Sequence, residues 1–300
     1  MNILNPKNNQ WFALTAGLTI AAVGVMAPSA KAATYTLDFE TGADGGSILY
    51  NTDGTLKGDQ WADWGLTNIS GINDRHDGAA KLNLYNTNEG GRDNDLRTAS
   101  YTKSNGKVVD YGTPAQGNVL IIQEEDGNSL RSNGTYKADD EARGGYLDFD
   151  FAEAVAFNSF SLLDIDDNGG GITVEGQKAD GGVLNIDIDA LMAEHHRVNG
   201  TNESAAQGTS VTMNGITMTQ VGNRQGDNSM FKFDVNDAHL TSVRFSYPGS
   251  GAISGLAWDT IDDGPQEIPE PSAMAGLLML GLAGKRLKRK RDEAVTLNNA

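Results

Sequence analysis

Cysteine is absent from the 300 residues, so no disulfide can stabilise the fold and no thiol can serve as a nucleophile. Two patterns of hydrolytic enzymes are also missing, the Gly-x-Ser-x-Gly elbow and the His-Glu-x-x-His zinc motif. Helical spacing is scarce, because only residues 190–198 show much of it. These absences predict a non-enzymatic, turn-rich protein whose stability comes from its core.

Basic residues are few and unevenly placed. The chain has 23 Lys plus Arg against 40 Asp plus Glu, a net charge of −17. Eight of the cations lie near the two ends, so residues 33–266 keep 15 cations against 36 anions, a net charge of −21. Such a surface repels nucleic acid and anionic lipid, so we expect no nucleic-acid partner. It suits divalent cations or neutral polymers, or simply keeps the protein soluble.

The N-terminal segment is typical of an export signal. Residues 1–10 are mostly polar, residues 11–26 are mostly apolar, and the small residues Ala30 and Ala32 follow. This order predicts a signal peptide over residues 1–32, cleaved after Ala32. The alternative is an uncleaved N-terminal anchor, against which the small residues and a preceding proline argue.

The other end of the chain combines three features in order. Pro269, Glu270 and Pro271 come first, and residues 273–283, all apolar or glycine, follow. A basic cluster comes last, made of Lys285, Arg286, Lys288, Arg289, Lys290 and Arg291. Over residues 265–300 this order resembles the PEP-CTERM sorting signal. The resemblance implies an exosortase-type membrane protease as partner, and delivery to the cell surface or the extracellular space.

Physical chemistry supports the same interpretation of this tail. Two prolines keep the backbone extended and accessible. The apolar segment is shorter than the roughly 20 residues of a comfortable span, which predicts a short sorting helix that inserts only transiently in the inner membrane. The basic cluster favours retention on the cytoplasmic side. The alternative is an ordinary weak C-terminal anchor.

The region between the signals, residues 33–264, reads as one all-β domain. Several segments alternate apolar and polar residues with the period of a half-buried strand: 35–39, 147–151, 184–188, 231–235 and 243–247. Residues 119–122 and 160–165 are mostly apolar, which predicts central strands covered on both faces. Asn214-Gly215 predicts a tight hairpin turn. A jelly-roll type β-sandwich fits this pattern best.

One segment matches the template of a calcium-binding loop. Asp164, Asp166, Asn168 and a following glycine, with Glu175 further on, supply the oxygen ligands that Ca²⁺ prefers around a tight turn. Calcium is therefore the predicted cofactor of this loop. The alternative is a polar hairpin turn, in which Asp, Asn and Gly are favoured for local reasons.

Two further ligand predictions come from the domain. Residues 37–40 and 256–262 resemble the first and last strands of carbohydrate-binding jelly rolls, and this resemblance implies a structural calcium between Glu40 and Asp259. Trp61 and Trp64 could stack on sugar rings, with Asp63 accepting hydrogen bonds from sugar hydroxyls. Outward-facing acids on edge strands and buried tryptophan anchors are the alternatives.

Two other candidate sites have weaker support in the sequence. The pair His195-His196 is expected to be solvated, since adjacent residues point in different directions. Glu124 and Glu125 form an acid pair of the kind that glycosidases use, but such pairs arise by chance in a domain this acidic. The sequence thus predicts an exported surface protein that binds or organises extracellular polysaccharide. A secreted glycan-acting enzyme and a purely structural coat component are the alternatives.

Overall fold

A computed structural model describes residues 32–89, 94–102, 105–126, 128–165, 171–200, 207–223 and 228–261. Both predicted sorting segments, residues 1–31 of the leader and residues 265–300 of the tail, lie outside these ranges. Residues 31–263 form a compact unit of their own. Among the described residues, no helix is long and apolar enough to cross a membrane.

The described part of the chain is mostly β-sheet, which confirms the predicted all-β class. In chain order the elements are β1 (Thr34–Leu37), the short 3₁₀ helix η1 (Ala62–Trp64), β2 (Leu66–Asn73), β3 (Gly78–Ala79), β4 (Leu82–Asn86), β5 (Ser100–Thr102), β6 (Val108–Asp110), β7 (Asn118–Ile122), β8 (Gly145–Leu163), β9 (Thr173–Lys178), β10 (Val183–Asp187), α1 (Ile188–Asn199), β11 (Ser210–Met213), β12 (Ile216–Gln220), β13 (Met230–Tyr247) and β14 (Ala252–Thr260).

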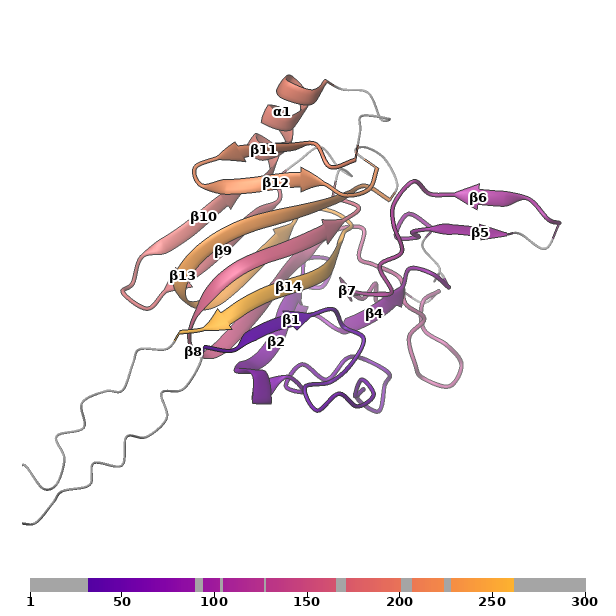
Figure 1. The fold of residues 1–300 in the computed structure, drawn as a ribbon. Coiled ribbons are helices and arrows are strands. Elements are labelled where there is room, and N and C mark those ends of the chain that lie inside the picture. Colours follow the sequence, from indigo (N-terminus) through magenta and orange to yellow (C-terminus); the bar gives the residue numbers. More distant parts are fainter. Residues whose placement is uncertain are drawn as a thin grey trace, which may run out of the picture. The chain divides into compact units, whose positions relative to one another are not determined.

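Two long strands, β8 and β13, run through both layers of the fold (Figure 1). They pair antiparallel along most of their length, but their register shifts between Asp234 and Ser242. Such bulges bend a strand and increase its twist. One continuous sheet therefore turns a corner and faces itself, which gives the molecule a β-sandwich character.

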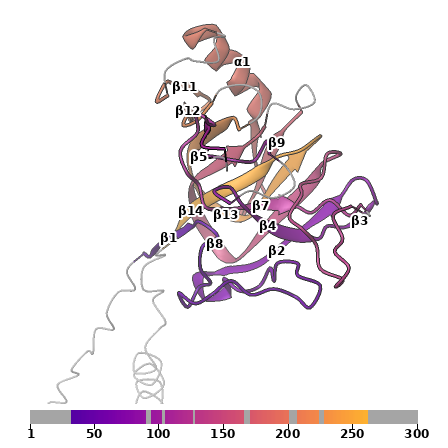
Figure 2. The same ribbon diagram turned by 90° about the vertical axis from the view of Figure 1, so that its right-hand side faces the viewer.

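Each layer takes one half of each long strand. The first layer contains β2, the start of β8, the end of β13, β9 and β10. The second contains β11, β12, the start of β13, the end of β8, and β14. β1 and β7 both pair with β14, and β4 pairs with β7. Figure 2 shows the domain after a quarter turn, with the elements of both layers labelled except β10.

Aromatic side chains fill the space between the layers. Phe149 and Phe245 of the first layer meet edge to face, with ring centroids 5.5 Å apart. Phe160 and Phe233 of the second layer stack at 4.7 Å. Phe160 also contacts Phe245 at 5.1 Å, which joins the two layers. Burying four such rings contributes on the order of 1.5–3 kcal/mol each.

Several local predictions are confirmed. Leu120 and Ile122 of β7 enter the main core, while Val119 and Ile121 enter a second, smaller cluster, so this strand is covered on both faces. Asn214 and Gly215 both adopt positive φ in the turn between β11 and β12. The helix is slightly longer than the predicted residues 190–198 and is capped by Asp187, whose carboxylate accepts from the backbone N–H of Ala190.

The two ends of the described domain lie side by side. β1 pairs antiparallel with β14, and the backbone N–H of Thr260 donates to the carbonyl of Ala33 at 2.9 Å. The other end of β14 begins beside β7, where Ala252 pairs with Ile121. β14 therefore links two regions of the domain. Its start lies near the end of β7, where the candidate site is found, and its end lies beside β1, where the two ends of the described domain meet.

Candidate functional site

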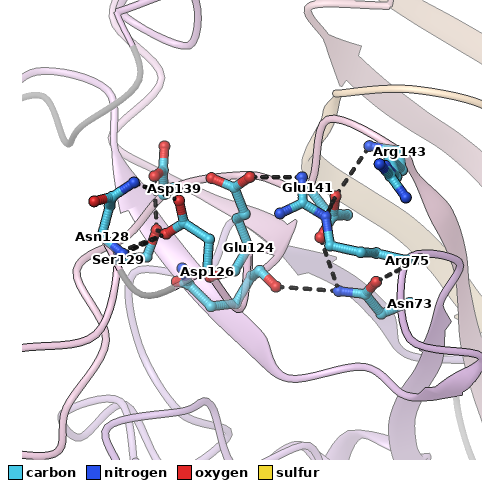
Figure 3. A network of polar contacts seen from close by, with 10 residues as sticks. Asn73, Arg75, Glu124, Asp126, Asn128, Ser129, Asp139, Glu141 and Arg143 are labelled. Carbon is cyan, nitrogen blue, oxygen red and sulfur yellow. Dashed lines mark hydrogen bonds and ion pairs between the residues drawn. The ribbon is translucent and has the colours of Figure 1, made fainter.

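An acidic centre lies where three segments meet. Glu124 and Asp126 follow β7, Asp139 and Glu141 belong to the segment before β8, and Arg75 follows β2 (Figure 3). We call these five residues the acidic centre. Four carboxylates and one guanidinium leave it with an excess of negative charge.

Backbone pairing explains why the acids come together. The N–H of Glu124 donates to the carbonyl of Asp139 at 2.7 Å, and the N–H of Glu141 donates to the carbonyl of Ile122 at 2.9 Å. Residues 139–141 therefore run antiparallel to residues 122–124, beyond the end of β7. Two runs of three acids, 124–126 and 139–141, are placed side by side by this pairing.

Arg75 holds one side of the centre. Its Nη2 lies 2.7 Å from Oε1 of Glu124, and its Nε lies 2.9 Å from Oε1 of Glu141. The side chain of Glu141 is 0% exposed, and its second oxygen accepts from Nδ2 of Asn73 at 3.1 Å. A buried carboxylate needs such partners, because desolvation of an unpaired charge is costly.

Ser129 and Asn128 hold the other side. The hydroxyl of Ser129 lies 2.8 Å from Oδ1 of Asp126 and 2.8 Å from Oδ2 of Asp139. The side-chain amide of Asn128 donates to Oδ2 of Asp126 at 3.0 Å. These hydrogen bonds, first the one from the Ser129 hydroxyl, lower the pKa of Asp126 to about 2. Asp126 is therefore fixed as a carboxylate.

The pKa of Glu124 shifts in the opposite direction to that of Asp126. Burial raises the pKa of Glu124, and the negative charges of Asp126 and Asp139 add to this effect, while Arg75 opposes it. Glu124, Asp126 and Asp139 each offer an oxygen, and these atoms lie within 4.8 Å of one another. Two ligands that each stand 2.3–2.6 Å from a Ca²⁺ ion can be up to about 5 Å apart. The three carboxylates thus have a spacing that a divalent cation could bridge.

The predicted calcium loop is only partly described. Asp166 and Asn168 lie outside the described residues, so the four-residue site stays a prediction. Asp164 follows β8, is fully buried, and accepts from the hydroxyl of Ser250 at 3.4 Å. Glu175 is exposed on β9, where it lies opposite Arg244 and Asn185. These two predicted ligands therefore face different surroundings.

The predicted pair Glu40 and Asp259 does not converge. Asp259 lies opposite Thr34 at the start of β1, and hydrogen bonds from Thr34 and Asn158 lower its pKa. Glu40 follows the other end of β1, where Oε1 accepts from the backbone N–H of Asn118 at 2.6 Å. The shared calcium site is thus contradicted, because β1 separates the two carboxylates.

The tryptophans serve the domain as anchors. Trp61 is 0% exposed, packs edge to face on Phe39, and donates from its indole N–H to the carbonyl of Thr41, so sugar stacking by Trp61 is contradicted. Trp64 is half-buried and stacks on Tyr35 with ring centroids 5.7 Å apart.

Asp63 and Trp64 still line small depressions. Asp63 is exposed and borders a pocket of about 170 Å³ together with Asp44 and Gln60. Trp64 borders a pocket of about 140 Å³ with Val155 and Thr260. Contact of these two residues with sugar stays a prediction.

His195 differs from its expected solvated state. It is fully buried in α1, its Nε2 lies 3.1 Å from Oγ1 of Thr209, and its ring packs on Phe231. The neighbouring His196 is only half-buried, as expected for adjacent positions on a helix.

Sequence reasoning named Glu124 but missed its partners. Asp126, Asp139, Glu141 and Arg75 were not singled out, because nothing local links them. One signal was present, since residues 124–126 and 139–141 are two runs of three acids that flank a segment with the turn pair Asn133-Gly134. A hairpin-like return of the chain would bring two such runs together.

The chain was compared with known protein families, curated proteins and solved structures. No family model, no curated protein and no solved structure matches this chain.

Proposed function

We propose that this protein is exported to the cell envelope, where its β-sandwich, of jelly-roll type, binds or organises extracellular polysaccharide without catalysis. A leader over residues 1–32 and a PEP-CTERM-like tail over residues 265–300 support export and surface delivery by an exosortase-type protease. The net charge of −21 over residues 33–266 favours a neutral polymer over an anionic one.

We further propose that the acidic centre holds a divalent cation, with calcium the expected ion. The observation that carries this proposal is the approach of oxygen atoms of Glu124, Asp126 and Asp139 to within 4.8 Å, in a centre where the one guanidinium pairs with Glu124 and Glu141. A bound cation would tie the end of β7 to the segment before β8. Its role is to fix the loops of this region for contact with polysaccharide.

A glycan-array screen of residues 33–266 tests the proposal, run in calcium and again in EGTA. Binding in calcium that is lost in EGTA is the expected result. Binding that survives EGTA would separate the polysaccharide from the cation, and binding in neither buffer would favour a structural coat component.

Sorting is tested independently of the domain. Cell fractions are blotted for the native protein and for a variant in which Pro269, Glu270 and Pro271 are replaced by alanine. The native protein is expected in the surface or extracellular fraction in processed form, and the variant in the membrane fraction at a larger size. Identical size and location for the two would contradict exosortase processing.

A glycan-acting enzyme is the second candidate. Glu124 and Asp126 have pKa values shifted in opposite directions, as in an acid and carboxylate pair. The pairing of Glu124 with Arg75 argues against this role, because the guanidinium favours the ionised form and occupies an oxygen that a general acid would use. Loss of glycan hydrolysis in Glu124→Gln, at unchanged glycan binding, would support the enzyme.

A further inference from the structure

The loop between β1 and η1 forms a pocket that is separate from the acidic centre. This loop is drawn in indigo and purple (Figure 1). The pocket has a volume of about 170 Å³, which is room for about five water molecules or one group of the size of a sugar ring. We call it the η1 pocket, and it is lined by Gly42, Asp44, Ser47, Leu49, Gln60 and Asp63.

Gln60 holds the walls of the η1 pocket in place. Its Oε1 accepts from the backbone N–H of Leu49 at 2.9 Å, and its Nε2 donates to the carbonyls of Lys57 at 2.8 Å and of Leu49 at 3.3 Å. The backbone N–H of Ala43 donates to the carbonyl of Gln60 at 3.4 Å. Walls that are already ordered lower the entropy cost of binding a ligand.

Glycine at position 42 leaves the floor of the η1 pocket open. Gly42 is buried, and a Cβ added there would lie 3.3 Å from Oδ1 of Asp44 and 3.8 Å from Oε1 of Gln60. A side chain at this position would therefore occupy space between two residues that line the pocket. The φ angle of Gly42 lies outside the left-handed region, so the backbone itself does not require glycine here.

The side chains of the η1 pocket favour a neutral, hydroxyl-rich ligand. Asp44 and Asp63 are exposed, and neither forms an ion pair with a cation of the described chain. Such carboxylates accept hydrogen bonds from hydroxyl groups and repel an anionic ligand. Leu49, 52% exposed at the rim, offers an apolar surface for the C–H face of a sugar ring.

The loop of the η1 pocket also contacts the segment that carries the acidic centre. Residues 51–55 and 131–135 form turns of the same kind, each closed by a 2.8 Å hydrogen bond between the backbone of its first and last residues. A Cβ added at Gly54 would lie 3.2 Å from Cβ of Thr135, so the two turns touch. The first turn follows Leu49 at the pocket rim, and the second lies between the two acidic runs. A cation that fixes the second turn therefore also supports the rim.

We infer that the η1 pocket receives one neutral sugar residue of the polysaccharide. Asp44 and Asp63 accept hydrogen bonds from its hydroxyls, and Leu49 packs against the apolar face of its ring. The inference rests on the proposed function, because it names the place where the polymer contacts the domain. It also explains how a cation in the acidic centre supports a sugar contact that contains none of the cation ligands.

The test uses the full-length protein and the exopolysaccharide of the native host, separated by anion exchange into a neutral and an anionic fraction. Each fraction is immobilised, and the binding of the native protein and of its variants is measured in calcium. Asp63→Ala and Leu49→Ser are each expected to bind the neutral fraction about tenfold more weakly. Both positions are exposed, so neither change removes a buried contact.

Matched controls replace exposed residues of the same kinds outside the η1 pocket. Asp59→Ala lies in the same loop, and Val183→Ser changes a residue that is 47% exposed on β10. Both are expected to bind the neutral fraction as the native protein does. Gly42→Ala adds a methyl group to the floor while both carboxylates remain, and it is expected to weaken binding as well.

Calcium distinguishes a failure of this inference from a failure of the proposed function. Asp63→Ala is expected to keep the calcium-dependent rise in melting temperature, whereas Asp139→Asn loses this rise and also binds the neutral fraction more weakly. Native-level binding by Asp63→Ala, Leu49→Ser and Gly42→Ala would overturn the η1 pocket and leave the proposed function standing. Native-level binding by Asp139→Asn would overturn the support of the rim by the cation. A native protein that binds neither fraction, or only the anionic one, would overturn both the inference and the proposed function.

Discussion

Two acidic segments of this protein invite a cation, and they differ in how their carboxylates are placed. In the segment from Asp164 to Glu175, the candidate ligands are close in sequence, yet Asp164 is buried after β8 and Glu175 points outward from β9. In the acidic centre, the ligands come from segments 15 residues apart in sequence, and their oxygens lie within 4.8 Å. Among the described residues, the carboxylates that converge are therefore those from the two runs that lie farther apart along the chain.

The difference shows what a strand does to a local motif. Alternate residues of β9 face opposite sides of the sheet. Because Val174 and Gly176 are buried on the inner side, Glu175 between them faces outward. Beyond β7, antiparallel pairing instead brings two separate acidic runs together. A ligand set is therefore decided by pairing register, which a spacing template does not contain.

The largest effect that would sharpen this comparison is expected from Arg75→Met. It leaves the buried Glu141 carboxylate without its cationic partner, so we expect the free energy of unfolding to fall by about 3 kcal/mol. Urea unfolding measures this. Arg244→Met is the matched control, because Arg244 pairs with Asp148 on the partly exposed outer face of the first layer, where solvent screens the pair and the expected loss is smaller, about 1 kcal/mol.

The double variant Arg75→Met/Glu141→Gln distinguishes two causes of the stability loss, the unpaired charge of Glu141 and the lost packing of the Arg75 side chain. Removing the buried charge together with its partner is expected to recover most of the lost stability. A double variant as unstable as Arg75→Met would assign the loss to packing of the arginine side chain.

Calcium itself should distinguish the two segments. At a hundredfold excess over its dissociation constant, a cation that binds only the folded state adds about 2.7 kcal/mol to stability. We expect Asp139→Asn to abolish the calcium-dependent rise in melting temperature, and Glu175→Gln to leave it intact. The reverse pattern would place the ion in the Asp164 loop. An identical melt in calcium and in EGTA would exclude both.

A third, smaller effect is expected in the pH dependence of folding stability and of calcium affinity. Because the pKa of Glu124 is raised in the folded protein, its protonated form is favoured there, and its contribution to stability in EGTA falls as pH rises above the ordinary value of 4.5. A bound cation favours the ionised form, so calcium affinity should rise over the same window, by up to about tenfold per pH unit. Calcium titrations at several pH values measure this, and Glu124→Gln should remove both slopes.

The smallest expected effect concerns Ser129. Its hydroxyl joins Asp126 to Asp139, so Ser129→Ala should cost about 1 kcal/mol of unfolding free energy. The pKa of Asp126 should rise from about 2 toward its ordinary 3.8, since its largest stabilising hydrogen bond is lost. The stability that Asp126 contributes is present above pH 3.8 and lost as pH falls through about 2. Carboxyl NMR titration of both proteins checks the shift, and an unchanged pKa would contradict the assigned cause.

Regular elements were predictable because their signals are local. The apolar run of β7 predicted burial on both faces, and Asn214-Gly215 predicted the turn between β11 and β12. Trp61 was not predictable in the same way. An exposed indole and a buried one have the same sequence signature, and only the packing of Phe39 against Trp61 places this residue in the core.

The sequence by itself determined the all-β class, the acidic character of the domain, and the two terminal segments that resemble export signals, because each depends on composition or on neighbouring residues. Only the tertiary structure decided that β8 and β13 turn from one layer into the other, and that Glu124 meets Asp126, Asp139 and Arg75. The physical reason is that register and bulges arise from the pairing of distant strands. No local pattern of residues encodes which of those distant partners will meet.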